Sequence, residues 1–173
     1  MLFFGHLGIA IFIASFIALP LIFAGIGVLL PDLLDKPLFI LGLTPCSRFI
    51  GHTLFFGAVV FSFVYFTTKN KKIALTLLFG ILLHLIQDFQ SFVPYFYPFV
   101  SYSFTEICQQ GPYTLHPTNL DYLFELIGLA LLIFVLYRRK NGKLKSIFSH
   151  KLLDSERRRI KEKIPTKKRV NKI

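Results

Sequence analysis

Long apolar stretches alternate with short polar breaks along the first 137 residues. Apolar side chains dominate residues 2–30, 51–68, 73–93 and 121–137. The hydrocarbon core of a bilayer is roughly 30 Å thick, and a helix needs about 20 residues to cross it. The stretches therefore predict membrane-spanning helices. Pro20 interrupts the first stretch, which predicts either two short helices or one kinked helix.

The polar breaks predict the connecting segments. The first apolar stretch stops at Pro31, and we expect a loop from there to about residue 50. Lys69-Asn70-Lys71-Lys72 ends the second stretch, and residues 94–120 combine Tyr, Phe and Pro, as membrane-interface belts do. The pattern predicts an all-α fold, a multi-pass transmembrane bundle of about four to five helices.

Composition agrees with a membrane protein and assigns the basic charge to one end. Hydrophobic residues make up 54% of the 173, and the mean hydropathy is +0.60, above the usual range of soluble domains. Of the 20 Lys and Arg, 15 lie in residues 138–173 with 3 acidic residues, a local net charge of +12. We predict a transmembrane domain over residues 1–140 and a basic cytoplasmic tail over 141–173, partly disordered or forming an amphipathic helix at 151–164.

The basic clusters also predict orientation and partners. The positive-inside rule places Lys69–Lys72 and the tail in the cytoplasm, so loops 31–50 and 94–120 face outward from the cell membrane. Tails of this kind bind anionic lipid headgroups, and we expect membrane lipids rather than nucleic acid as partners. Cys46 and Cys108 lie in the two outer loops, and the sequence leaves open whether they pair. It also leaves the oligomeric state open.

Acidic and histidine side chains gather near the outer ends of the predicted helices. An ionised carboxylate in a bilayer is costly unless it is paired, hydrated or metal-bound. The first 137 residues hold six acidic side chains and five Lys or Arg, so a bound cation would offset the excess. The candidate ligands are His6, Asp32, Asp35, His52, His84, Asp88, Asp121 and Glu125.

Spacing supports a shared site. His84 and Asp88 are four positions apart and so project from one helix face, and Asp121 and Glu125 repeat this spacing. Imidazole nitrogen combined with carboxylate oxygen favours zinc, with manganese or iron as alternatives, over calcium. Each residue also has a purely structural interpretation. His84 alone would be a hydrogen-bonded core histidine, and Asp121 would cap the last helix.

The order of these motifs resembles a known family. His6, Pro31-Asp32-x-x-Asp35, Arg48-x-x-Gly51-His52-Thr53 and His84-x-x-x-Asp88 together are similar to the YdjM-like family of membrane-bound metal-dependent hydrolases. That family is distantly similar to zinc-dependent phospholipase C and related zinc nucleases. The resemblance covers roughly residues 1–137. It implies that six residues are metal ligands or their immediate neighbours: His6, Asp32, Asp35, His52, His84 and Asp88.

The resemblance also implies a role for the last helix and shows two departures. Asp121 and Glu125 would match a later His-x-x-x-Glu helix of the soluble enzymes, with Asp in place of His. The family's Arg-Gly-x-Thr-His segment is here Arg48-Phe49-Ile50-Gly51-His52-Thr53, and one extra residue separates Asp32 from Asp35.

These observations favour a metal-dependent hydrolase. Its substrate would be a phosphoester or a lipid-linked molecule at the outer membrane face. A metal would activate water, Asp35 or Asp32 would orient that water, and Arg48 would pair with a phosphate oxygen. The alternatives are a metal-ion or proton transporter, which uses the same residue types, and a non-catalytic membrane scaffold with a basic tail.

Overall fold

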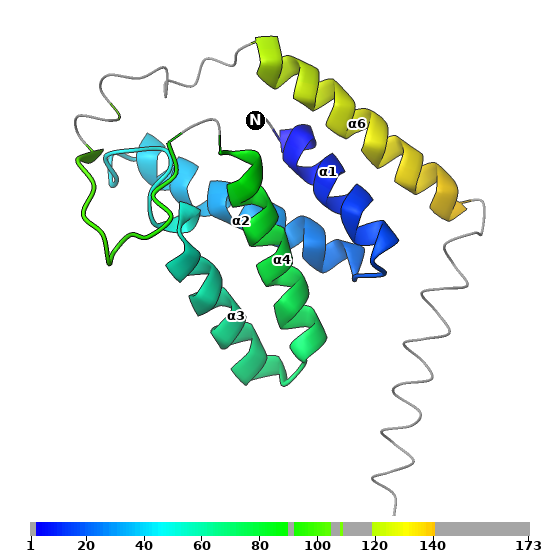
Figure 1. Cartoon of the computed structure of the whole chain (residues 1–173), viewed down its shortest axis with the longest axis horizontal. Helices are drawn as coiled ribbons and strands as arrows, with labels where there is room; N and C mark the ends of the chain where they lie inside the picture. Colours follow the sequence, from blue (N-terminus) through cyan, green and yellow to red (C-terminus); the bar gives the residue numbers. More distant parts are fainter. Residues whose placement is uncertain (1–2, 90–91, 105–107, 109–118, 141–173) are drawn as a thin grey trace, which may run out of the picture. The chain divides into compact units, whose positions relative to one another are not determined.

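The described part of the chain is all-helical. The computed structural model describes residues 3–89, 92–104, 108 and 119–140. Their helices are α1 (Phe3–Phe16), α2 (Leu21–Ile40), the short 3-10 helix η1 (Ile50–His52), α3 (Leu54–Thr68), α4 (Lys71–Gln87) and α6 (Asn119–Lys140) (Figure 1). These residues contain no strand. The prediction of an all-α fold is confirmed.

The chain divides into two compact units, Met1–Val135 and Leu136–Ile173. The first unit contains α1 to α4, η1 and most of α6, and it carries the site described below. The second unit is described only over the last turn of α6. The predicted tail over 141–173, including the amphipathic helix at 151–164, lies outside the described residues and stays a prediction.

The first apolar stretch forms two helices, and the second of them is longer than the sequence indicated. Ala18 has a φ of 55° and Pro20 is the N-cap of α2, so the chain turns between α1 and α2. α2 then continues through Pro31 and Pro37 to Ile40, although we expected a loop after Pro31. A proline inside a helix removes a backbone hydrogen bond, and the turn after Pro31 carries Asp35, whose carboxylate accepts N–H groups of Phe49, Gly51 and His52.

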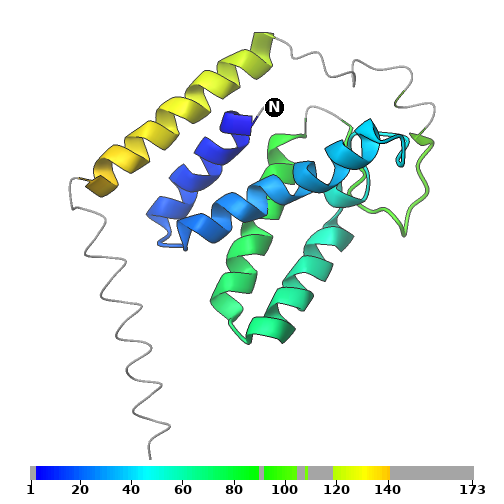
Figure 2. The same cartoon turned by 180° about the vertical axis from the view of Figure 1, so that it is seen from behind.

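α3 and α4 form an antiparallel hairpin with conventional caps (Figure 2). Lys69 is the C-cap of α3. It adopts the left-handed conformation and donates its N–H to Tyr65 O. Asn70 then caps α4, because its side chain accepts from the N–H groups of Lys72 and Ile73. The Lys69–Lys72 cluster therefore lies at the opposite end of α4 from His84.

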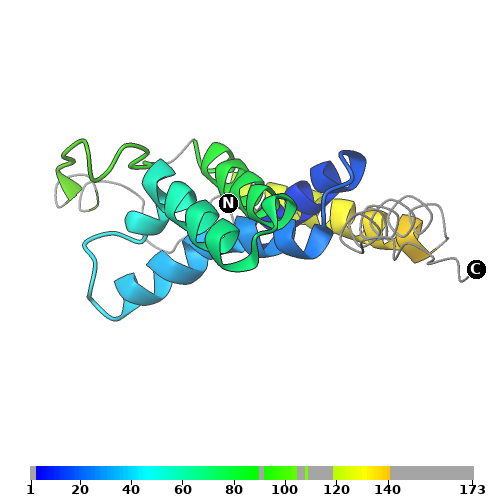
Figure 3. The same ribbon diagram turned by 90° about the horizontal axis from the view of Figure 1, so that it is seen from below.

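α2 crosses α4 at very short range, and two glycines make this possible. Figures 1 and 2 show the crossing from opposite sides, and Figure 3 shows it from below, with α2 beneath α4. A Cβ on Gly80 would lie 2.6 Å from Ala24 O and 2.7 Å from Val28 N, and a Cβ on Gly27 would meet the backbone of α4. Because His84 lies one turn beyond Gly80, the crossing brings its ring against the backbone of α2.

One helix of the described residues is long and apolar enough to cross a membrane. α6 has 22 residues and a mean hydropathy of 2.1 over its most apolar window, of which 11% is buried. It is therefore not the core helix of a soluble domain, which would be mostly buried. α1 and α3 are also apolar, but with 14 and 15 residues they are shorter than the ~20 residues of a typical span.

The α2–α4 crossing gives a first prediction. Gly80→Ala would place a methyl group against backbone atoms that cannot rotate away, and it should destabilise the fold by about 1–3 kcal/mol. Gly25→Ala is the matched control in α2, because its Cβ would meet only the side-chain ends of Leu7 and Ile11, at 3.2 and 3.4 Å. Thermal unfolding in detergent measures both variants. Equal losses of stability would contradict the close crossing.

Candidate metal centre

Five ionisable side chains from four segments meet in the interior. His6 on α1, Asp35 on α2, His52 in η1, His84 on α4 and Asp88 just after α4 are all 2% exposed or less. Burying such groups is unfavourable unless each finds a partner. Their partners therefore define what the cluster can do.

The orientation of His84 is fixed by a backbone carbonyl. Its Nδ1 lies 2.7 Å from Val28 O, at the α2–α4 crossing. A carbonyl oxygen only accepts hydrogen bonds, so Nδ1 carries the proton and donates it. In the neutral ring the other nitrogen, Nε2, then has a free lone pair. That lone pair points into the cluster.

His52 is held in the same way, by a carboxylate. Its Nδ1 donates to Asp35 Oδ2 at 2.7 Å. Asp35 also accepts from the backbone N–H groups of Phe49, Gly51 and His52, at 2.6, 2.9 and 3.2 Å. Both carboxylate oxygens are therefore occupied by donors. Asp35 lies behind His52. Its hydrogen bonds hold residues 49–52 against α2, beyond Pro31.

The two rings direct their Nε2 atoms at each other, with two carboxylates beside them. The Nε2 atoms of His52 and His84 are 3.1 Å apart. Asp32 Oδ1 lies 3.5 and 3.8 Å from them, and Asp88 Oδ2 lies 3.7 and 3.8 Å from them. Ligand atoms about 2.0–2.1 Å from a tetrahedral zinc ion are about 3.3 Å from one another. His52, His84 and Asp88 form one group of donors close enough together to hold a metal ion.

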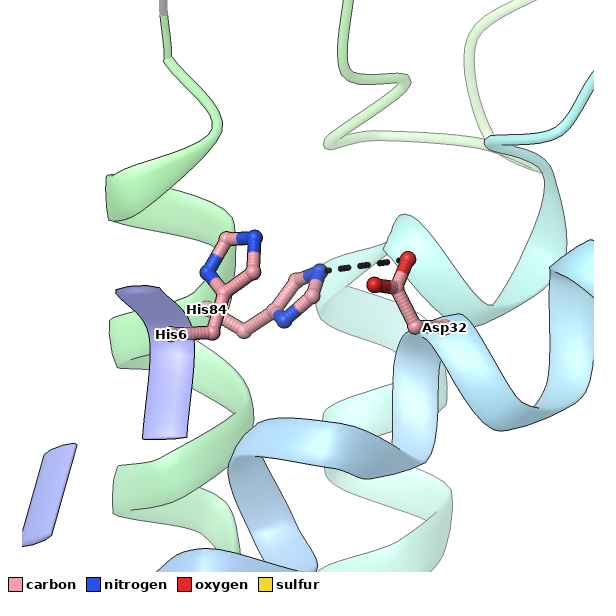
Figure 4. A group of neighbouring side chains, drawn as sticks. All are labelled: His6, Asp32 and His84. Atoms are coloured by element: carbon pink, nitrogen blue, oxygen red, sulfur yellow. Dashed lines mark ion pairs between the residues drawn. The ribbon is translucent and has the colours of Figure 1, made fainter. Parts of the chain in front are cut away.

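His6 adds a third imidazole beside this pair. Its ring stacks on His84 with centroids 4.1 Å apart, and its Nδ1 donates to Gln87 Oε1 at 2.6 Å. Figure 4 shows His6, His84 and Asp32 approaching one another from three helices. His6 Nε2 lies 3.3 Å from Asp88 Oδ1 without a hydrogen bond. Among the described residues, His6 Nε2 and Gln87 Nε2 are the buried side-chain atoms that lack a hydrogen-bond partner.

The charges in the cluster leave room for a cation. Lys36 Nζ pairs with Asp32 Oδ2, and Arg48 Nε pairs with Asp88 Oδ2, both at 2.6 Å. Asp35 has no Lys or Arg partner among the described residues, so with neutral histidines the cluster has a net charge of −1. Burial lowers the pKa of His52, but its hydrogen bonds to Asp32 and Asp35 outweigh burial and raise that pKa above its usual value. A metal ion bound by His52 would compete with a proton for the His52 Nε2.

Six of the eight predicted ligands come together in this cluster, and two do not. The groups of described residues that can share an ion are His6, Asp32 and His84, and His52, His84 and Asp88. Asp35 lies immediately behind them. Asp121, in the first turn of α6, and Glu125 belong to neither group. Both oxygens of Glu125 accept backbone N–H groups of α1 instead.

The structure also pairs the two cysteines. Cys46 and Cys108 form a disulfide between positions 62 residues apart, which ties the segment before Arg48 to the segment after α4. The Phe49 ring packs between the rings of Tyr97 and Phe104, with centroid distances of 5.1 and 5.0 Å. The disulfide and this aromatic cluster together hold the chain around Arg48.

Some residues of the site had no assignment from the sequence. Lys36 lies four residues after Asp32, a spacing that favours an ion pair on a helix, but we expected a loop there. Gln87 and the Val28 carbonyl hold His6 and His84, and neither has a sequence signal. Backbone carbonyls have none in general, because every residue carries one.

Comparison with known proteins does not extend this description. No family model, no curated protein and no solved structure matches the chain. The residues that the structure describes define a helical protein with one candidate membrane span and a buried His/Asp cluster that could hold a metal ion.

The role of Asp35 gives a second prediction. Asp35→Asn keeps the size of the side chain but replaces one acceptor oxygen with an NH₂ group, so His52 and the 49–52 backbone lose a partner. Metal affinity should fall about 10–100-fold, as it does when outer-shell partners of ligating histidines are changed. A chelator-competition titration measures this. The control is Thr76→Ala, a buried polar residue of α4 bonded to Lys72 O, and an Asp35→Asn affinity equal to the control's would refute the role.

Proposed function

We propose that this protein is a multi-pass, membrane-bound, metal-dependent hydrolase of phosphoesters, with its site at the outer face of the cell membrane. The observation that carries the proposal is the pair of histidine Nε2 atoms 3.1 Å apart, each fixed by Nδ1 donation and flanked by Asp32 and Asp88 oxygens. Because each Nδ1 proton is donated elsewhere, the two Nε2 atoms face each other, and either a shared proton or a bound cation satisfies both lone pairs. The YdjM-like resemblance supplies the reaction class.

The donor set indicates which metal and which residues. His52, His84 and Asp88 form one group that could share an ion, and they are the proposed ligands; His6 Nε2 is available beside them. Imidazole and carboxylate together suit zinc best, with manganese or iron as alternatives. When bound, such an ion supplies Lewis-acid activation of water and of a phosphoryl oxygen.

Exposure indicates the side from which a substrate would enter. The side chains of Asp32, Lys36 and Arg48 are 15%, 39% and 19% exposed, whereas the histidines, Asp35 and Asp88 are almost completely buried. The approach therefore lies between α2 and the segment that carries Arg48. Two cations flank it, and a guanidinium has further N–H groups beyond the Nε that Asp88 accepts. An anionic group such as a phosphoester fits this approach.

The same geometry supports Asp32 over Asp35 as the carboxylate that orients the attacking water. Both oxygens of Asp35 already accept N–H groups. Asp32 lies at the open side, with Oδ2 on Lys36 and Oδ1 facing the histidine pair. A water held there would meet a carboxylate whose other oxygen is paired with Lys36.

Membrane insertion beyond α6 is supported by apolar exposure. Phe63, Phe66, Ile22 and Ile86 are each at least 63% exposed, although they belong to α2, α3 and α4. Single exposed apolar residues are common in soluble proteins, but here large apolar side chains are exposed on α1, α2, α3, α4 and α6. Lipid contact on these faces accounts for it, with the shorter helices assisted by aromatic interface residues.

Two independent signals support the proposed orientation. The Lys69–Lys72 cluster begins α4, and the metal cluster lies at its other end, about 25 Å away at 1.5 Å per residue. Lysines favour the cytoplasmic side. The Cys46–Cys108 disulfide, which lies near Arg48 in the sequence, requires an oxidising compartment. Gathering all ligands at one end also favours a hydrolase over a transporter, whose ionisable groups would form a path across the membrane.

Metal content and activity test this proposal directly. Detergent-purified protein should contain about one or more zinc, manganese or iron ions per chain and hydrolyse members of a phosphoester panel. His84→Ala/Asp88→Ala should lose both properties while remaining in the membrane fraction. Thr76→Ala is again the control on α4. A folded wild-type protein without metal after supplementation would refute the metal site, and full activity in the double variant would refute the mechanism.

The two cations at the approach give a further prediction. Lys36→Gln and Arg48→Gln should each raise KM for an anionic substrate about 10-fold, because each removes a hydrogen bond to a charged group. Lys72→Gln, an exposed lysine at the far end of α4, should not change KM. Rates are compared at full metal occupancy, because Lys36 and Arg48 also pair with Asp32 and Asp88. Unchanged KM values would place the substrate elsewhere.

A further inference from the structure

We infer that Glu125 is a positioning residue that sets His6 in the metal cluster by holding the first turn of α1. The inference rests on the proposed metal site and assigns Glu125 a role that the resemblance does not imply. Its basis is the contact between α6 and α1 within the first unit of the chain.

The carboxylate of Glu125 grips the start of α1 with both oxygens. Oε1 accepts from Phe4 N at 2.9 Å, and Oε2 accepts from Gly5 N at 2.8 Å. The first N–H groups of a helix have no partner within the helix and carry a partial positive charge. A carboxylate that bridges two of them both satisfies the donors and fixes the lateral position of the turn. His6 is the next residue after this bridge.

Three glycines bring the two helices close enough for the bridge to form. A Cβ on Gly128 would lie 2.6 Å from Gly5 Cα, and a Cβ on Gly8 would lie 2.6 Å from Gly128 Cα. Small residues of this kind let helix backbones touch, as they do in membrane bundles. The rings of Phe12 and Phe134 continue the contact at a centroid distance of 6.2 Å. α6 thus meets α1 through backbone contact and one carboxylate.

His6 is the side chain that depends most on this support. It is the only member of the cluster that α1 contributes among the described residues, and its contacts there are Gln87, Asp88 and the face of the His84 ring. Its Nε2 lacks a hydrogen-bond partner. Gln87 orients the His6 ring through Nδ1, and the distance of His6 Nε2 from an ion depends further on where α1 places the His6 backbone. Glu125 cannot ligate the ion in this state, because both of its oxygens are bound to α1.

A double-mutant cycle tests the inference with zinc affinity as the readout. Glu125→Ala should weaken zinc binding about 10–100-fold, the range for residues that orient ligands. Glu125→Gln, which keeps one acceptor oxygen, should give an intermediate loss. In a His6→Ala background neither change should weaken binding further, because the residue through which Glu125 acts is already absent. Leu126→Ala, at a neighbouring position that is 67% exposed, is the control.

Zinc binding in a His52→Ala background distinguishes a positioning role of Glu125 from a general loss of stability. In His52→Ala protein, Glu125→Gln should still weaken zinc binding by the same factor as in wild type. Equal losses in the His6→Ala and wild-type backgrounds would overturn the inference while leaving the metal site intact. If wild-type protein binds no zinc, manganese or iron, the proposed function fails first and this inference with it. If Glu125→Ala does not fold, the cycle with Glu125→Gln decides.

Discussion

The arrangement of this protein depends on how three buried imidazole rings are oriented. His6, His52 and His84 each donate Nδ1–H to an oxygen: a glutamine amide, an aspartate carboxylate and a backbone carbonyl. Each bond fixes which nitrogen is free, and His84 belongs to both groups that could share an ion, one with His6 and Asp32 and one with His52 and Asp88. The glycine contact between α2 and α4 supplies the carbonyl, and the folding of η1 over α2 supplies the carboxylate. The packing of the backbone therefore determines how the histidines of the site are oriented.

The acidic residues of the cluster differ in exposure, and their roles differ accordingly. Asp35 is completely buried and both of its oxygens accept N–H groups, so its role is structural. Asp88 is buried and pairs with Arg48, and Asp32 is partly exposed and pairs with Lys36. The cations stabilise carboxylates that would otherwise repel one another, and both stand on the accessible side. A negatively charged substrate would meet them before it met the histidines.

Much of the fold followed from local sequence. The all-α class, the break at Pro20 and the polar turn at Lys69–Lys72 depend on hydrophobic runs, proline and capping residues, which act over a few positions. The continuation of α2 through Pro31 and Pro37 did not follow, because the hydrogen bonds that this part of α2 makes through Asp35 come from residues 49–52, which are distant in the sequence. The pairing of Cys46 with Cys108 likewise depends on two distant segments meeting.

For the site, the sequence by itself determined the residue types and the local pairs. The His84/Asp88 spacing and the scarcity of basic partners indicated eight candidate ligands, of which five belong to groups that could share an ion and Asp35 bonds to one of those five. Only the tertiary structure separated their positions, with Asp35 behind His52, Lys36 on Asp32, and Glu125 on the first turn of α1 rather than among the ligands. The physical reason is that these roles depend on backbone N–H and C=O groups. Every residue carries such groups, so their use is decided by where the helices cross and leaves no mark in the sequence.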